Sequence, residues 1–259
     1  MDFIISANTD IGISKSTNQD SLMVKTINTE FGKMVFAVLC DGMGGLSKGE
    51  VASATVIRSF DDWLMNVFPS LCDRIDEQLI RTEWEQIIYN QNILIGNYGQ
   101  KNNIKLGTTV VVMLITESKY YIMNVGDSRA YEITSATLRQ ITDDQTLVAR
   151  EVKLGNLTPE QAEKDPRRSV LLQCVGASPT VSPDMFFGEV NKNAVYMLCS
   201  DGFRHEISPY EIYNSLNPSV LTDLNTMKSN TISLIELNKQ RYERDNISVV
   251  LVKTLNQLL

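Results

Sequence analysis

Two hydrophobic periods alternate along the first hundred residues. Apolar and polar residues alternate over 21–27 and an apolar run fills 33–40, which predicts two strands joined by a hairpin around 28–32. The period then becomes helical, first over 51–68 and again from 71 towards 95. The pattern therefore predicts a strand hairpin followed by two consecutive helices.

Strand patterns return after this helix pair. Apolar runs at 108–115, 120–125 and 129–133 are separated by turns at 116–119 and 126–128. Three short strands with no helix between them predict a meander, in which chain neighbours pair antiparallel.

Regular periodicity fades from 143 to 183, where four of the seven prolines lie. Only 146–153 and 159–164 have patterns compatible with short helices. This segment is predicted to be a surface insertion packed beside the functional site.

The last part of the chain repeats the order of strands and then helices. Ser208, Pro209 and Glu211 form an N-cap, a first-turn proline and a capping-box acid, which predicts where one helix starts. The elements predicted here are strands at 185–190 and 194–198, helices at 208–216 and 221–242, and a closing strand at 247–252.

This order of elements predicts an α+β fold. A doubly wound parallel sheet alternates single helices with strands, whereas here helices come in pairs between groups of antiparallel strands. Two sheets covered by helix pairs fit better, and the 259 residues, 43% of them apolar, are expected to form a single domain over 1–259.

Composition narrows the class of protein further. The net charge is −7 and the lysines and arginines are scattered, which disfavours attraction to nucleic acid or anionic lipid. No apolar run approaches the roughly 18 residues of a membrane span, and the N-terminus does not resemble a signal peptide. Cys40, Cys72, Cys174 and Cys199 lack paired spacing. We therefore expect a cytoplasmic protein in a reducing compartment.

Candidate chemistry lies at the ends of the predicted strands. Asp41, Asp127 and Asp201 each follow an apolar strand, while Asp20 and Asp245 each precede one. Because the end of one strand lies beside the start of its antiparallel neighbour, all five could share one rim. Each alone would be an ordinary turn or cap residue.

Such a cluster indicates a particular metal chemistry. With one histidine in the chain and no cysteine pair, the carboxylates suit magnesium or manganese better than zinc. Two such ions about 3.5–4 Å apart can hold a bridging hydroxide and direct it at a phosphoryl phosphorus. The reaction class indicated is hydrolysis of a phosphomonoester.

Six ordered motifs between residues 15 and 246 resemble those of the metal-dependent serine/threonine protein phosphatases, the type 2C family, and the second resembles its bacterial branch. They are Lys15-Ser16-Thr17-Asn18-Gln19-Asp20, Asp41-Gly42-Met43-Gly44-Gly45, Gly107-Thr108-Thr109, Gly126-Asp127-Ser128-Arg129, Ser200-Asp201-Gly202 and Asp245-Asn246.

The resemblance implies a role for each matching residue. Asp41 would bridge two metals, with the Gly42 carbonyl as a further ligand, and Asp201 and Asp245 would complete the first site. Asp20 would orient metal-bound water.

The resemblance also implies a third cation and a particular fold. Asp127 with Asp201 would match a third metal position, so two to three manganese or magnesium ions are expected, and Asn246 would support Asp245. The implied fold is a four-layer α-β-β-α sandwich, with 143–183 as a variable flap.

Two positions depart from the family pattern. Lys15 stands where an arginine usually grips the substrate phosphate, so weaker phosphate binding is expected. Met43 stands where some relatives have a histidine that is a candidate general acid, which leaves water held through Asp127 as the candidate donor. His205, the only histidine, is expected to have a structural or surface role.

Other residues of the motifs are expected to support the site without binding metal or substrate. Thr108 and Thr109 are expected to supply hydroxyl hydrogen bonds beside the site, and Ser128 and Arg129 to brace the turn at Asp127.

The function expected from the sequence is removal of phosphate from serine and threonine of phosphoproteins, opposing a serine/threonine kinase, by a monomer. Two alternatives stay open. Lys15 leaves room for a degenerate phosphatase that only binds phosphoproteins, and the motifs do not exclude a phosphoesterase that acts on small molecules.

Overall fold

The computed structural model describes residues 1–43 and 48–255, and in these ranges the chain forms two antiparallel sheets packed face to face. One sheet has the order β1-β11-β10-β7-β8, with β1 (Asp2–Asp10), β7 (Arg129–Ile133), β8 (Leu138–Gln140), β10 (Val195–Cys199) and β11 (Ile247–Leu255). The other has the order β2-β3-β5-β6-β9, with β2 (Asp20–Thr29), β3 (Gly32–Met43), β5 (Val110–Ile115), β6 (Lys119–Val125) and β9 (Asp184–Glu189), while β4 (Gly107–Thr108) pairs with the end of β3.

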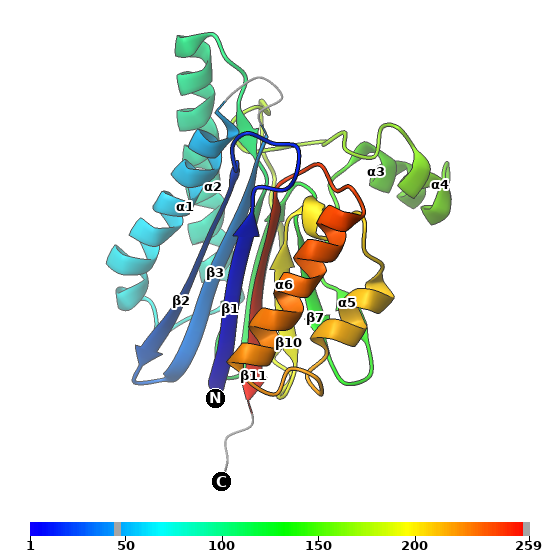
Figure 1. The fold of residues 1–259 in the computed structure, drawn as a ribbon. Coiled ribbons are helices and arrows are strands. Elements are labelled where there is room, and N and C mark those ends of the chain that lie inside the picture. The colour runs from blue at the N-terminus through cyan, green and yellow to red at the C-terminus, as the bar shows by residue number, and fades with distance from the viewer. Residues whose placement is uncertain (44–47, 256–259) are drawn as a thin grey trace.

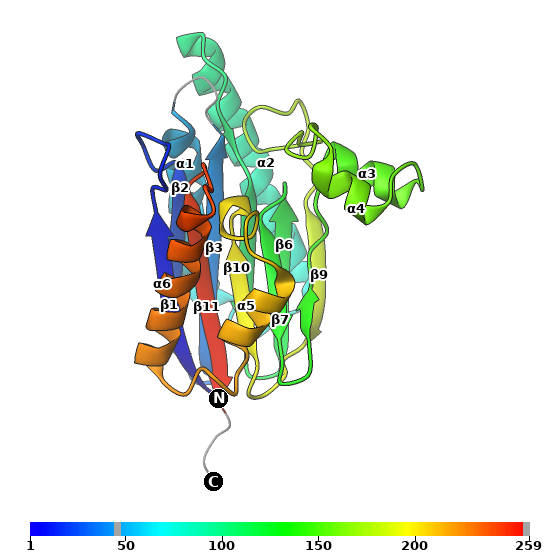
Figure 2. The same ribbon diagram turned by 45° about the vertical axis from the view of Figure 1, so that its right-hand side comes forward.

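Helices cover the outer face of each sheet, which gives the predicted four layers (Figure 1). The sheet containing β3 is covered by α1 (Gly49–Asn66) and α2 (Glu77–Asn102), and the sheet containing β10 by α5 (Pro209–Leu216) and α6 (Leu224–Gln240). Two short helices, α3 (Leu147–Lys153) and α4 (Pro159–Lys164), lie to one side of the sandwich in the insertion (Figure 2).

The long apolar run in β3 follows from its position in the sandwich. Phe36 and Val38 face the cluster under α1 and α2, while Val35, Ala37 and Leu39 face the cluster between the two sheets. A strand buried on both faces needs apolar residues at successive positions, not at alternate ones.

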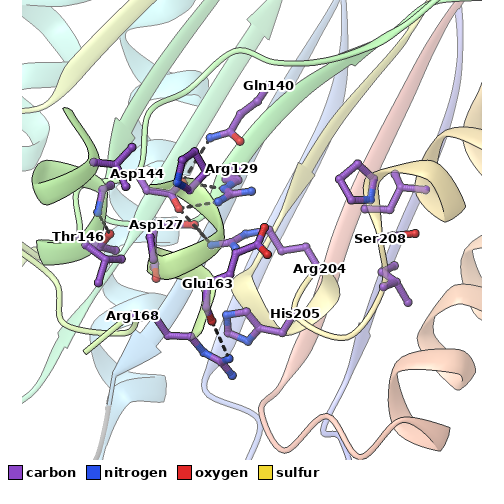
Figure 3. A pocket seen from close by; sticks show the side chains of 18 of the residues that line it. Asp127, Arg129, Gln140, Asp144, Thr146, Glu163, Arg168, Arg204, His205 and Ser208 are labelled. Carbon is purple, nitrogen blue, oxygen red and sulfur yellow. Dashed lines mark hydrogen bonds and ion pairs between the residues drawn. The ribbon is translucent and has the colours of Figure 1, made fainter. Parts of the chain in front are cut away.

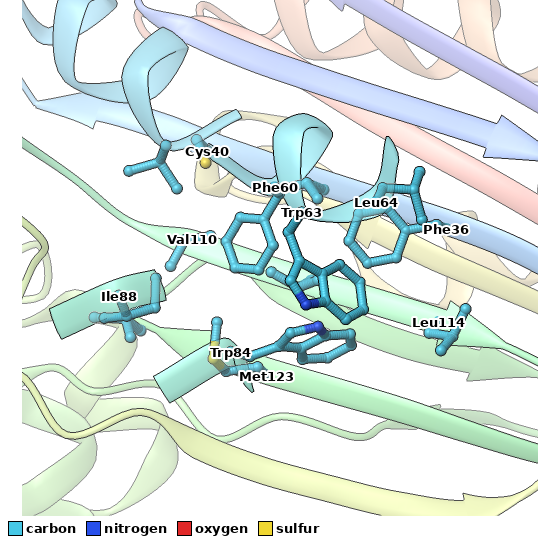
Figure 4. Close-up of a cluster of buried hydrophobic side chains, with 14 of the residues drawn as sticks. Phe36, Cys40, Phe60, Trp63, Leu64, Trp84, Ile88, Val110, Leu114 and Met123 are labelled. Carbon is cyan, nitrogen blue, oxygen red and sulfur yellow. The ribbon is translucent and has the colours of Figure 1, made fainter. Parts of the chain in front are cut away.

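Aromatic side chains dominate the core beneath α1 and α2 (Figure 4). Trp84 is fully buried and lies edge-on to Phe60 and Trp63, with ring centroids 6.2 and 6.1 Å away. The ring of Phe36 in β3 packs against the same tryptophan, with 5.9 Å between the ring centroids. These edge-to-face contacts fix how the helix pair sits on the sheet.

The predicted meander is wrong at its third strand. β7 pairs with β10 and β8 in the other sheet and does not pair with β6. Between the two strands Gly126 takes a positive φ of 105°, and an added Cβ there would lie 2.7 Å from the Thr109 side chain. The chain therefore crosses between sheets at this glycine, which no side chain could replace without a shift.

Other differences are local. The second helix begins at Glu77 and not near residue 71, because the Asp76 carboxylate caps it by accepting the Leu79 N–H at 2.7 Å. The strands β1 and β8 were not predicted. In contrast, α5 starts with the predicted capping box of Ser208 and Glu211.

Truncation of the buried tryptophan tests the packing of this core. We expect Trp84→Ala to lower the free energy of unfolding by about 3–5 kcal/mol, because it empties a fully buried site. Tyr89→Ala, on the same helix but with 62% of the tyrosine exposed, is the matched control and should change it little. Urea denaturation of both variants measures the difference, and equal losses would contradict the packing described.

Candidate active site

Strand pairing brings four of the five predicted aspartates to one rim of the sandwich. Asp20, the first residue of β2, pairs directly with Asp41. Across the other sheet Cys199 pairs with Val249, so that Asp201 after β10 and Asp245 before β11 emerge at the same end. One detail differs from expectation, because Asp41 lies within β3, which continues to Met43.

The fifth aspartate joins them where the chain crosses between sheets. Asp127 lies between β6 and β7, and Arg129 at the start of β7 pairs with Cys199, two residues before Asp201. Burial raises the pKa of Asp41, and the carboxylates of Asp20, Asp201, Asp245 and Asp127 raise it further. The other four side chains therefore lie within electrostatic reach of Asp41.

Burial makes this cluster costly in the absence of a cation. Burial raises the pKa of Asp20 to about 7, and the neighbouring Asp201 carboxylate adds to the rise. Burial and Asp201 likewise raise the pKa of Asp127 to about 7. Within residues 1–43 and 48–255, nothing hydrogen-bonds to either oxygen of Asp20 or to Oδ1 of Asp201. Unpaired buried carboxylate oxygens fit the ligand preference of hard divalent cations.

The same rim is not arranged as a closed coordination sphere. In the part of the chain that the structure describes, no three His, Cys, Asp or Glu side chains converge tightly enough to hold one ion. Lys15 instead places its Nζ 2.6 Å from Oδ1 of Asp245. The residue predicted to bind phosphate thus forms an ion pair with a predicted metal ligand.

Hydroxyl groups hold the backbone of Asp41. Its N–H donates to Oγ1 of Thr109 at 3.1 Å, and its carbonyl accepts from the Thr108 hydroxyl at 2.9 Å. The Thr109 hydroxyl also pairs with that of Ser128 at 2.7 Å, which connects the Asp41 strand to the Asp127 turn. The hydrogen bonds expected of the two threonines and of Ser128 are therefore present.

Gly42 is needed because backbones approach closely at this point. A Cβ on Gly42 would lie 2.4 Å from the carbonyl oxygens of both Gln19 and Gly49. The residue cannot carry a side chain without separating β3 from the start of α1. Gly44 and Gly45, the remaining glycines of the motif, lie outside the described residues.

Asn246 connects the segment before β2 with the segment before β11. Its Oδ1 accepts the N–H of Gln19 at 2.9 Å, and its Nδ2 donates to the carbonyl of Ile11 at 2.9 Å. Its own N–H donates to Oδ1 of Asp245 at 2.8 Å. The Asn246 side chain thereby positions the residue before Asp20, while its main-chain N–H supports Asp245.

An arginine–aspartate–arginine group holds the Asp127 turn and was only partly predicted (Figure 3). Arg129 makes two hydrogen bonds of 2.7 Å to Asp144. Arg204 lies 3.5 Å from Asp144 and donates to the Asp127 carbonyl at 3.0 Å. Arg129 was expected to brace this turn, whereas Asp144 and Arg204 were missed. Arg204 lies close to the Ser200-Asp201-Gly202 motif in the sequence, whereas Asp144 had no such signal.

A cavity of about 850 Å³ opens beside this group, between the insertion and α5. Asp127, Arg204 and His205 line it together with Lys164 and Arg168 of the insertion. Residues of the insertion therefore share this cavity with the Asp127 turn.

The sequence profile of the family described as "Protein phosphatase 2C" matches residues 13–232. The chain belongs to this family. The predicted enzyme class, a protein-serine/threonine phosphatase, is confirmed, and so is the fold. In the residues described here, no helix of this 2C phosphatase has the length and hydropathy to cross a bilayer.

Relatives of this 2C phosphatase come from bacteria. A putative protein phosphatase 2C-type from Streptococcus pyogenes is 31% identical over 250 residues, 96% of each chain. The serine/threonine phosphatase Stp1 from Staphylococcus aureus is 29% identical, with a TM-score of 0.84 over 99% of this chain and 96% of that one. The catalytic domain of the phosphatase PstP, solved with two manganese ions, is 26% identical, with a TM-score of 0.78 over 98% and 99%.

The raised pKa of Asp20 predicts a pH-dependent cost in chelator-treated protein. A carboxyl with a folded pKa of about 7 and an unfolded pKa of 3.8 binds more protons when folded, so stability falls as pH rises between these values. Asp20→Asn removes this cost. We expect it to raise the free energy of unfolding at pH 8 by up to about 4 kcal/mol relative to wild type, and to bring little gain at pH 4.

Urea denaturation in EDTA at both pH values measures this difference. Asp73→Asn, at an exposed position, is the control and should give the same small change at each pH. A gain from Asp20→Asn that does not depend on pH would contradict the burial described for Asp20.

Proposed function

We propose that this 2C phosphatase hydrolyses phosphoserine and phosphothreonine on proteins at the rim formed by Asp20, Asp41, Asp127, Asp201 and Asp245. The observation that carries the proposal is the convergence of five carboxylates, of which both oxygens of Asp20 and Oδ1 of Asp201 are buried without partners among the described residues. We further propose that residues 1–259 act as one domain, with 143–183 as its flap, and that the enzyme opposes a serine/threonine kinase. A monomeric state and a cytoplasmic location stay predictions.

The residues at the rim fit divalent cations. Asp41 and the Gly42 carbonyl, with Asp201 and Asp245, would hold two manganese or magnesium ions, and Asp127 with Asp201 a third. The donors are all oxygen atoms, which suits these ions. The two manganese ions reported with PstP, a relative of similar fold, support the choice of metal. When bound, the cations supply Lewis acidity that activates water and neutralises charge on the phosphate oxygens.

The chain's own side chains then orient the reactants. Asp20 would accept a hydrogen bond from the attacking water, a role supported by the lack of partners for both of its oxygens in the described part of the chain. Lys15 would bind a phosphate oxygen once its ammonium leaves Asp245. Met43 has no proton to give to the leaving alkoxide, and water held through Asp127 is the candidate donor.

Phosphate release from two substrates separates this function from its alternatives. With manganese present, we expect release from a phosphothreonine peptide and, more slowly, from an aryl phosphate, and loss of both in Asp41→Asn. Release from neither substrate would favour the binding module, and release from the aryl phosphate alone would favour a small-molecule phosphoesterase. Calorimetric titration of the peptide then tests whether a protein without turnover still binds it.

A second test concerns Lys15. Lys15→Arg should lower the KM for the phosphothreonine peptide a few-fold at saturating manganese, because a guanidinium grips two phosphate oxygens where an ammonium offers a point charge. Steady-state kinetics measures the change. A KM that is unchanged or higher would contradict the proposed role of Lys15 in phosphate binding.

A further inference from the structure

His205 lies between two carboxylates at the edge of the rim. Its Nε2 is 3.5 Å from Oδ2 of Asp201, and its Nδ1 is 3.4 Å from Oε2 of Glu243. The ring is largely buried, with 18% of the side chain exposed, and it faces the cavity beside Asp127 (Figure 3). It is therefore neither a surface residue nor part of the apolar core.

Glu243 is buried and connects this histidine to the Asp245 turn. One of its oxygens, Oε1, accepts the backbone N–H groups of Arg244 and Asp245 at 2.6 and 2.8 Å. The preceding residue, Tyr242, has a positive φ of 67°, a conformation that costs a non-glycine residue energy. The backbone thus adopts a strained turn that carries the glutamate side chain inward.

A buried asparagine joins the same two segments through the backbone. Asn238, at the end of α6, accepts the N–H of Glu243 at 3.0 Å through its carbonyl. Its side-chain Nδ2 donates to the Phe203 carbonyl, two residues after Asp201, at 2.9 Å. The segments that bear Asp201 and Asp245 are therefore tied together both by Asn238 and by the contact between His205 and Glu243.

The two oxygens of Asp201 have different surroundings. Oδ2 faces the His205 ring, whereas Oδ1 is buried and has no hydrogen-bond partner among residues 1–43 and 48–255. A neighbour that engages one oxygen of a carboxylate fixes its rotation and leaves the other for a cation. Contacts of this kind orient metal ligands, and their loss costs roughly 10–100-fold in metal affinity.

We propose that His205 and Glu243 are positioning residues for the metal centre. His205 lies against Oδ2 of Asp201 and would leave Oδ1 for a cation, while Glu243 places Oε2 3.4 Å from the ring and accepts the Asp245 N–H through Oε1. Neither residue belongs to the six motifs by which the chain resembles its family. The inference rests on the proposed metal centre, and it assigns the sole histidine a task other than proton donation.

Manganese binding to the full chain, freed of metal by a chelator, tests this proposal directly. We expect His205→Ala to raise the manganese dissociation constant about tenfold in calorimetric titration, at a temperature where circular dichroism shows a folded chain. His205→Gln, whose amide N–H reaches towards Asp201, should restore part of the affinity. Glu236→Gln, an exposed glutamate on α6, is the control and should bind as wild type does.

Kinetics separates positioning from other roles. At saturating manganese, His205→Ala should keep the wild-type KM for the phosphothreonine peptide, because the proposed role of His205 acts on Asp201 and not on substrate. Manganese affinity equal to or above wild type in His205→Ala overturns the proposal, even if the variant melts at a lower temperature. Where His205→Ala does not fold, Glu243→Gln carries the test, with the same expected weakening.

Failure of this inference can be told apart from failure of the proposed function. If wild-type protein binds no manganese, the metal centre is wrong and the positioning role falls with it. If wild type binds manganese and the His205 and Glu243 variants bind it equally well, only the positioning role is wrong.

Discussion

Mutual repulsion among buried carboxylates is the constraint on which this structure depends. Antiparallel pairing places Asp20 directly opposite Asp41, and the crossing between sheets adds Asp127. Burial together with neighbouring negative charge raises the pKa of all three. A fold that gathers such groups gives up stability in the metal-free state, and a cation with oxygen ligands returns it. The sandwich can bear this cost because three apolar clusters fill the space between its layers.

Holding the carboxylates in place requires contacts that do not themselves compete for a cation. The backbone of Asp41 is held by threonine hydroxyls, and the Asp127 carbonyl by Arg204. In both cases the proposed metal ligand is held through its main chain. Asp201 and Asp245 differ, since His205 lies beside one oxygen of Asp201 and Lys15 pairs with one oxygen of Asp245.

The sequence predicted the strands and helices that are determined by residues close together in the chain. A long apolar run predicted the strand β3, and the capping box of Ser208 and Glu211 predicted the start of α5. The edge strand β1 was missed because it is only half buried and mixes polar with apolar residues. The sheet to which β7 belongs depends on tertiary pairing with β10, which periodicity in the chain does not encode.

The same distinction separates the predicted site residues from those that were missed. Aspartates at strand ends could be gathered by a simple rule of pairing, and the structure brings all five together at one rim. The bracing residues Asp144 and Glu243 carry no such signal, because their partners come from distant segments.

Lys15 links metal binding to phosphate binding at the rim. Its ammonium pairs with Asp245, a carboxylate that the proposed metal centre also needs. A cation that takes this oxygen releases the lysine, and a released lysine is free to meet a phosphate oxygen. Because linkage is reciprocal, phosphate that binds Lys15 frees Asp245 and favours the cation by the same factor. The substitution of lysine for arginine thus concerns metal affinity as well as phosphate affinity.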